Sequence, residues 1–188
     1  MHDPAREAIL LLGDPALRER SVPVADFEEP RFRTEGRRLI RALEQFRAEH
    51  GFGRAISAPQ IGIHRRLIAM NLGDGPFLLV NPELTRLADA RFTMWDDCMS
   101  FPWLMVRLER RLTVDLEFQD ETGAEQHWNS VDQAVAELLQ HEIDHLDGTL
   151  AIDRALGRDA IVARPLYEER RSYFDRQVDY AIVPTLAR

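Results

Sequence analysis

The chain has 188 residues, and its 24 Lys and Arg against 32 Asp and Glu give a net charge of −8. This charge argues against a surface that binds nucleic acid or anionic lipid, because such surfaces need clustered Lys and Arg. The apolar run AILLL near the N-terminus is too short to span a membrane. A single cysteine, Cys98, excludes an intrachain disulfide and favours a reducing compartment, so we expect a soluble cytoplasmic protein.

Residues 31–50 predict the first helix. Its apolar residues at helical spacing are Leu39, Ile40, Leu43 and Phe46. Gly51 follows them directly and is typical of a helix end. We therefore expect one long amphipathic helix in the first third of the chain.

Strand-like runs follow at residues 66–72, 77–82 and 111–118. In the last run the alternating apolar residues are Leu112, Val114, Leu116 and Phe118. Such alternation is typical of a half-buried strand. Residues 119–123 (QDETG) predict a hairpin turn, and residues 124–128 the returning strand.

A second helix is predicted from Ser130, because Ser130 and Gln133 fit a capping box, and Gly148 is a suitable end residue. A further helical stretch is expected at residues 165–181. Strands joined by hairpins, rather than alternating with helices, predict an α+β fold. We expect residues 1–188 to form a single domain.

The second helix contains the segment LLQHEIDHLDG, in which His141 and His145 are four residues apart. On a helix they lie on one face, so both imidazoles can reach one metal ion. Glu142 lies beside the first histidine, where its carboxylate can take a proton from water that the metal has acidified. This pattern predicts a metal-dependent hydrolase. The alternative, without any metal site, is a surface helix with scattered charge.

The third ligand separates the classes of metal site. A metzincin needs a histidine at position 151, which is Ala, so that class is excluded. A gluzincin-type protease would use a downstream carboxylate, and Glu168 or Glu169 is a candidate. Cys98 would complete a Cys–His–His set that leaves one coordination position open, as a catalytic site requires. Alternatively, Cys98 is only a small buried apolar residue.

Three short motifs in fixed order resemble those of the peptide deformylase family. GRAISAPQ (53–60) is similar to G-x-G-x-A-A-x-Q, and DDCMS (96–100) to E-G-C-x-S. QHEIDHLDG (140–148) meets the third motif, Q-H-E-x-D-H-L-x-G, in full. The resemblance covers about residues 9 to 154 and leaves the C-terminal segment 155–188 outside.

The resemblance implies an α+β fold with antiparallel sheets around the metal-binding helix. Cys98, His141 and His145 would hold one divalent metal, with Fe²⁺ expected natively and Zn²⁺ or Ni²⁺ as alternatives. Glu142 would be the general acid and base. The Gln60 amide and the Met99 backbone N–H would stabilise the oxyanion. The substrate-binding residues implied are Gly53, Arg54, Ala55, Asp97 and Glu137.

The implied reaction is removal of the N-formyl group from formyl-methionyl peptides of newly made proteins. The partners would be N-formylated peptides and nascent chains at the ribosome; the sequence does not define the oligomeric state. Two alternatives remain. One is a related metallo-amidase for another small formyl or acyl amide, and the other is an inactive deformylase-like binding protein.

Several positions depart from the family pattern. Ala55 replaces a glycine, Ser57 an alanine and Asp97 another glycine, which adds bulk and charge near the site. Arg54 and Glu137 stand where relatives carry apolar residues that line the methionine pocket. We expect Arg54 and Glu137 either to pair at the pocket and change which side chain fits, or to point to solvent and leave the pocket apolar.

Overall fold

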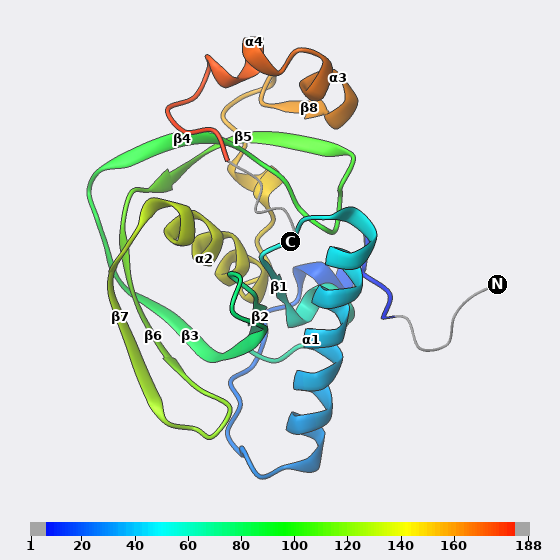
Figure 1. The fold of residues 1–188 in the computed structure, drawn as a ribbon, viewed down its shortest axis with the longest axis vertical. Helices are drawn as coiled ribbons and strands as arrows, with labels where there is room; N and C mark the ends of the chain where they lie inside the picture. The colour runs from blue at the N-terminus through cyan, green and yellow to red at the C-terminus, as the bar shows by residue number, and fades with distance from the viewer. Residues whose placement is uncertain (1–6, 183–188) are drawn as a thin grey trace, which may run out of the picture.

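The structure, a computed structural model, describes residues 7–182 and combines helices with two antiparallel sheets (Figure 1). The five-stranded sheet has the order β1 (Ala55–Ser57), β2 (Leu67–Met70), β3 (Phe77–Leu87), β6 (Val114–Gln119) and β7 (Glu125–Val131). The three-stranded sheet has the order β4 (Arg91–Asp96), β5 (Leu104–Arg111) and β8 (Ile161–Ala163). The helices are α1 (Pro30–His50), α2 (Gln133–Leu146), α3 (Arg164–Glu169) and α4 (Arg171–Asp175). Short 3₁₀ turns lie at Pro15–Arg18 (η1), Ala58–Ile61 (η2) and Ala151–Arg154 (η3). The predicted α+β class is confirmed.

Helix α1 forms where the apolar spacing predicts it. Leu39, Leu43 and Phe46 are buried, and Ile40 is half-buried at the edge of the same face. The helix ends at Gly51, whose left-handed φ of 75° lets the chain turn back toward β1. This face of α1 covers β1 and β2, as Figure 1 shows.

The predicted strand 111–118 is wrong as a single element. Arg111 is the last residue of β5. The N–H of the next residue, Leu112, donates to the carbonyl of Ala90, which directly precedes β4, so Leu112 still follows the three-stranded sheet. Val114 instead pairs with Leu87 and Val131 in the other sheet. The chain crosses between sheets at residues 112–113, which leaves Leu112 exposed although the alternation places it inside. The predicted hairpin at 119–123 is confirmed by the Gly123 N–H, which donates to the Asp120 carbonyl (3.0 Å).

Helix α2 lies between the two sheets (Figure 1). Its N-cap is Asp132, which accepts from the Val135 N–H (3.1 Å). The predicted capping box at Ser130 is wrong, because Ser130 belongs to β7 and donates its N–H to Asp115 (2.7 Å). The residues of α2 that are buried run without interruption from Ala136 to Leu146. A helix enclosed in this way carries its polar side chains into the interior, where each needs a partner.

The C-terminal part of the described chain packs on the three-stranded sheet. The predicted helix 165–181 is two short helices, since the backbone leaves the helical region at Arg170 (φ −115°) between α3 and α4. The Trp95 indole of β4 donates to the Phe174 carbonyl (3.0 Å) and contacts the Tyr167 and Phe174 rings. Among residues 7–182, no helix has the length and apolar character to cross a membrane.

The end of α2 depends on Gly148. Its φ is 72°, and a Cβ there would lie 2.4 Å from the Arg18 carbonyl oxygen. Gly51 has a similar φ of 75° but open space around it. We expect Gly51→Ala to lower the free energy of unfolding by about 1 kcal/mol from backbone strain alone. Gly148→Ala should cost roughly 3 kcal/mol or more, because backbone atoms must also move. Equal losses in urea unfolding would contradict this.

Candidate active site

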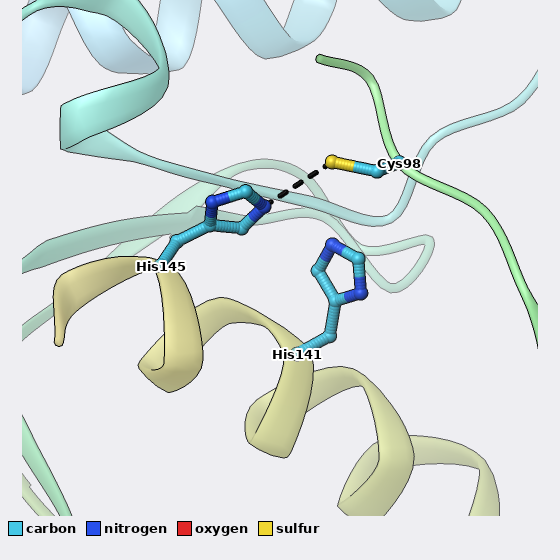
Figure 2. A group of neighbouring side chains, drawn as sticks. All are labelled: Cys98, His141 and His145. Carbon is cyan, nitrogen blue, oxygen red and sulfur yellow. Dashed lines mark hydrogen bonds between the residues drawn. The ribbon is translucent and has the colours of Figure 1, made fainter. Parts of the chain in front are cut away.

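Cys98, His141 and His145 converge on one buried point (Figure 2). Their ligand atoms all lie within 4.8 Å of one another, and the Cys98 Sγ is 3.2 Å from the His145 Nε2. Figure 2 shows the two rings rising from successive turns of α2 toward the sulfur, which follows the end of β4. A thiolate and two imidazoles at this spacing fit one divalent ion such as Fe²⁺, Zn²⁺ or Ni²⁺. In the described part of the chain, neither Glu168 nor Glu169 belongs to this group.

A buried carboxylate orients the first histidine. Asp96 Oδ2 lies 2.9 Å from His141 Nδ1 and accepts from Arg110 at 3.2 Å. Burial would raise the pKa of Asp96, but the adjacent His141 and Arg110 lower it to about 2. A charged Asp96 holds the Nδ1 proton and leaves the Nε2 lone pair of His141 for a metal. The shorter Asp96 therefore reaches the position that the family pattern gives to glutamate.

The second histidine is kept neutral. Burial lowers the pKa of His145 well below its usual value. Its Nδ1 is buried and has no hydrogen-bond partner among the described residues. Neutral imidazole is the form that binds a metal, so this environment favours ligation.

Ser57 fixes Glu142 in place. The Ser57 Oγ lies 2.5 Å from the Glu142 Oε2 and 2.8 Å from the Glu142 backbone carbonyl. Burial raises the pKa of Glu142, while His141 and the Ser57 hydrogen bond act in the opposite direction. A carboxylate with a raised pKa can both accept and return a proton near neutral pH. The sequence shows Ser57 only as a departure from the family pattern, and this contact could not be read from it.

Gln60 points its amide toward the three candidate ligands Cys98, His141 and His145, here called the metal group. The Ser57 N–H donates to Gln60 Oε1 (2.9 Å), which assigns the other end of the amide as the donor. Gln60 Nε2 then lies 3.2 Å from the Ser100 Oγ and 3.6 Å from the Cys98 Sγ. The N–H groups of Gln60 are therefore directed toward Cys98 and Ser100.

These residues line one cleft of about 330 Å³. The predicted site residues on its wall are Gly53, Arg54, Ala55, Gln60, Asp97, Cys98, Met99, Glu137, His141 and Glu142. His145 reaches the cleft through its contact with Cys98. The sequence did not predict that Arg164, Tyr167 and Ile182 also line the cleft.

Arg54 and Glu137 form an ion pair inside the cleft. The Glu137 side chain is 2% exposed and that of Arg54 15%, so the solvent-facing alternative is wrong. Arg54 also donates to the Ala134 carbonyl (2.7 Å), which ties it to the first turn of α2. Burial raises the pKa of Glu137 to about 7, and the Arg54 charge opposes that rise.

Asp97 is accommodated by a partner from the C-terminal segment. Arg164 of α3 donates to the Asp97 carboxylate (2.6 Å), and its guanidinium lies 5.6 Å from the Phe52 ring centroid. Positive φ values at described non-glycine residues occur only at Asn81 and Ser130, so Asp97 carries no such strain. Its side chain is thus held against Arg164.

The chain is similar to peptide deformylases in sequence. The sequence profile of the family described as polypeptide deformylase matches residues 6–160. A peptide deformylase of Thermotoga maritima is 35% identical over 146 residues, which cover 78% of this chain and 85% of the relative. One from Prochlorococcus marinus is 34% identical over 157 residues, which cover 80% of this chain and 74% of the relative.

Solved structures of peptide deformylases have a fold similar to that of this chain. A crystal structure of peptide deformylase from Thermotoga maritima matches with a TM-score of 0.73 and 31% identity, over 83% of this chain and all of that one. The structure of the Synechococcus elongatus enzyme in complex with actinonin matches with a TM-score of 0.73 and 30% identity, over 84% and 82% of the two chains. Because the profile, the relatives and the fold all extend over most of its length, the chain belongs to the polypeptide deformylase family, hydrolases that act on N-formyl amide bonds.

Proposed function

We propose that this protein is a metal-dependent amide hydrolase that removes the N-formyl group from formyl-methionyl peptides of newly made proteins. The observation that carries the proposal is the convergence of Cys98, His141 and His145 with Glu142 and Gln60 in one cleft. Its substrates in the cell would be nascent chains at the ribosome. The buried, unpaired thiol of Cys98 supports a cytoplasmic location, where it stays reduced.

One divalent ion would be held by Cys98, His141 and His145, with Fe²⁺ expected natively and Zn²⁺ or Ni²⁺ able to replace it. When bound, the ion supplies Lewis-acid polarisation and makes water a nucleophile near neutral pH. The contact of Asp96 with His141 supports this assignment, since metal-binding histidines are commonly held by a carboxylate.

The residues of the chain move the proton and stabilise the charge. Glu142, oriented by Ser57, would accept the proton of the attacking water and deliver it to the departing amine. The Gln60 amide and the Met99 backbone N–H would donate to the oxygen of the former formyl group as it gains negative charge. The donor end of Gln60 already faces Cys98, which supports its role.

The peptide would extend from the metal group along the cleft. Gly53, Arg54 and Ala55 form one edge, and Asp97 with Arg164 the other. Tyr167 and Ile182 also line the cleft, which supports a single catalytic domain that includes the C-terminal segment. Residues 1–6 and 183–188 of that predicted domain lie outside the described residues.

Glu142→Gln should lower kcat/KM for a formyl-Met peptide by about 10²- to 10⁴-fold, because the amide cannot take the proton. Metal content, measured on the same sample, should remain one ion per chain, since Glu142 is not a ligand. Turnover that survives the substitution would contradict the assigned role, and absence of turnover in the unaltered iron-loaded protein would favour the inactive binding protein.

Cys98→Ser should weaken metal binding by at least about 100-fold, because it replaces a thiolate ligand with a hydroxyl. Glu168→Gln is the matched control, since Glu168 lines the cleft outside the metal group. Metal content after dialysis against a chelator checks both variants. Loss of metal from Glu168→Gln, with retention in Cys98→Ser, would indicate the gluzincin arrangement instead.

Ser57→Ala restores the alanine of the family pattern but removes the hydrogen bond to Glu142. We expect kcat/KM to fall by about 10- to 150-fold, because hydrogen bonds to charged groups contribute roughly 1.5–3 kcal/mol. Metal content and thermal stability should change little by comparison. An unaltered rate would show that the bond has no part in catalysis.

A further inference from the structure

The cleft has a buried arm and an open mouth. The arm lies along the first half of α2, where Ala55, Glu137 and Leu138 are at most 8% exposed. The mouth is lined by more accessible residues, among them His50, Glu168 and Arg171. The accessible mouth lets a peptide chain continue into solvent, whereas the buried lining of the arm suits a side chain. The first side chain of a bound formyl peptide therefore enters the arm.

The Arg54–Glu137 pair lies within reach of that side chain. Glu137 precedes the ligand His141 by four residues, which is about 6 Å along the helix axis. The side chain of a formylated first residue begins three bonds from the formyl carbon, so one as long as methionine or glutamine spans this distance. The Arg54–Glu137 ion pair thus lies in this part of the cleft, together with the apolar residues Ala55 and Leu138.

The pair retains hydrogen-bonding capacity toward the cleft. A guanidinium has five N–H donors, and Ala134 and Glu137 accept from two of those of Arg54. Arg54 is bonded to one oxygen of Glu137, the Oε1, which leaves the Oε2 as an acceptor. Among the described residues, some buried polar atoms have no hydrogen-bond partner, and no atom of Arg54 or Glu137 is one of them. A side chain with both a donor and an acceptor can bond to both partners.

We propose that Arg54 and Glu137 make the arm a polar side-chain subsite, so that formyl peptides with a hydrogen-bonding first side chain, such as glutamine, are hydrolysed about as well as formyl-methionyl peptides. The inference rests on the proposed deformylase function and specifies its substrate class. Methionine and glutamine suit the comparison because they have similar length and volume and differ in polarity. An apolar arm would reject glutamine, because its amide would lose hydrogen bonds to water without replacement.

The first experiment compares kcat/KM for formyl-Met-Ala-Ser and formyl-Gln-Ala-Ser with the iron-loaded protein. We expect the Met-to-Gln ratio to be no greater than about 3, against the 10- to 200-fold discrimination that an apolar pocket gives. The double substitution Arg54→Leu, Glu137→Leu should raise the ratio at least tenfold. Both residues are replaced together, because one alone would leave a buried charge without its partner.

The matched control is Arg91→Gln with Glu109→Gln, an exposed ion pair between β4 and β5. This control also removes one positive and one negative charge, but at a place outside the cleft. The Met-to-Gln ratio should therefore stay as in the unaltered protein. A ratio above 10 in the unaltered protein would overturn the inference. A ratio that the Arg54, Glu137 double substitution leaves unchanged would also overturn it.

A binding measurement separates this inference from the proposed function. Glu142→Gln retains the arm but should turn over at least about 100-fold more slowly, so calorimetry on this variant can compare the Kd values of the same two peptides. Values within threefold support the polar subsite, even if the double substitution fails to fold, and a tenfold preference for formyl-Met-Ala-Ser overturns it. If the unaltered protein hydrolyses neither peptide but the Kd values agree, the deformylase function fails and the polar subsite stands.

Discussion

The burial of α2 is the constraint on which the site depends. From Ala136 to Leu146 every residue of this helix is buried, although six of the side chains are polar or ionisable. These are Glu137, Gln140, His141, Glu142, Asp144 and His145. Unpaired, such groups would cost more free energy than a domain of this size can lose. Both sheets therefore supply partners: Arg54 and Ser57 come from the five-stranded sheet and its approach, and Asp96 and Arg110 from the three-stranded one.

The same pairing prepares the chemistry. Arg110 donates to both Asp96 and Asp144, and Asp96 in turn holds His141, so a structural cation fixes the orientation of a metal ligand. On the other side of the helix, the Ser57 hydroxyl donates to the Glu142 carboxylate. The Ser57 backbone N–H donates to the Gln60 side-chain oxygen and so sets the orientation of the Gln60 amide. Since these contacts already exist in the folded chain, little reorganisation is needed when substrate arrives.

The sequence predicts what depends on local spacing and misses what depends on long-range contact. His141, His145 and Gly148 follow from helical geometry, and the structure places Cys98 beside them as the motifs imply. The predicted N-cap, Ser130, is wrong because Ser130 and Asp132 are both good capping residues. The pairing of β7 with β6 keeps Ser130 in the sheet, so α2 begins after Asp132. Strands β4 and β5 were not predicted, because charged residues that pair across the sheet interrupt their apolar pattern. The bond of Ser57 to Glu142 spans 85 residues and has no local signature.

The two departures from the family pattern that add a carboxylate to the cleft, Asp97 and Glu137, each have a compensating arginine. A carboxylate at Asp97 or Glu137 alone would be a poorly solvated charge at the cleft wall, but each has an arginine opposite, Arg164 and Arg54. Arg164 lies beyond residue 160, where the match to the family profile ends, so the C-terminal segment supplies the countercharge for a change inside the second motif. Neither arginine could be exchanged for an apolar residue without leaving its carboxylate unpaired. Because Arg164 belongs to α3, the Asp97 carboxylate on the cleft wall depends for its countercharge on the packing of the C-terminal segment.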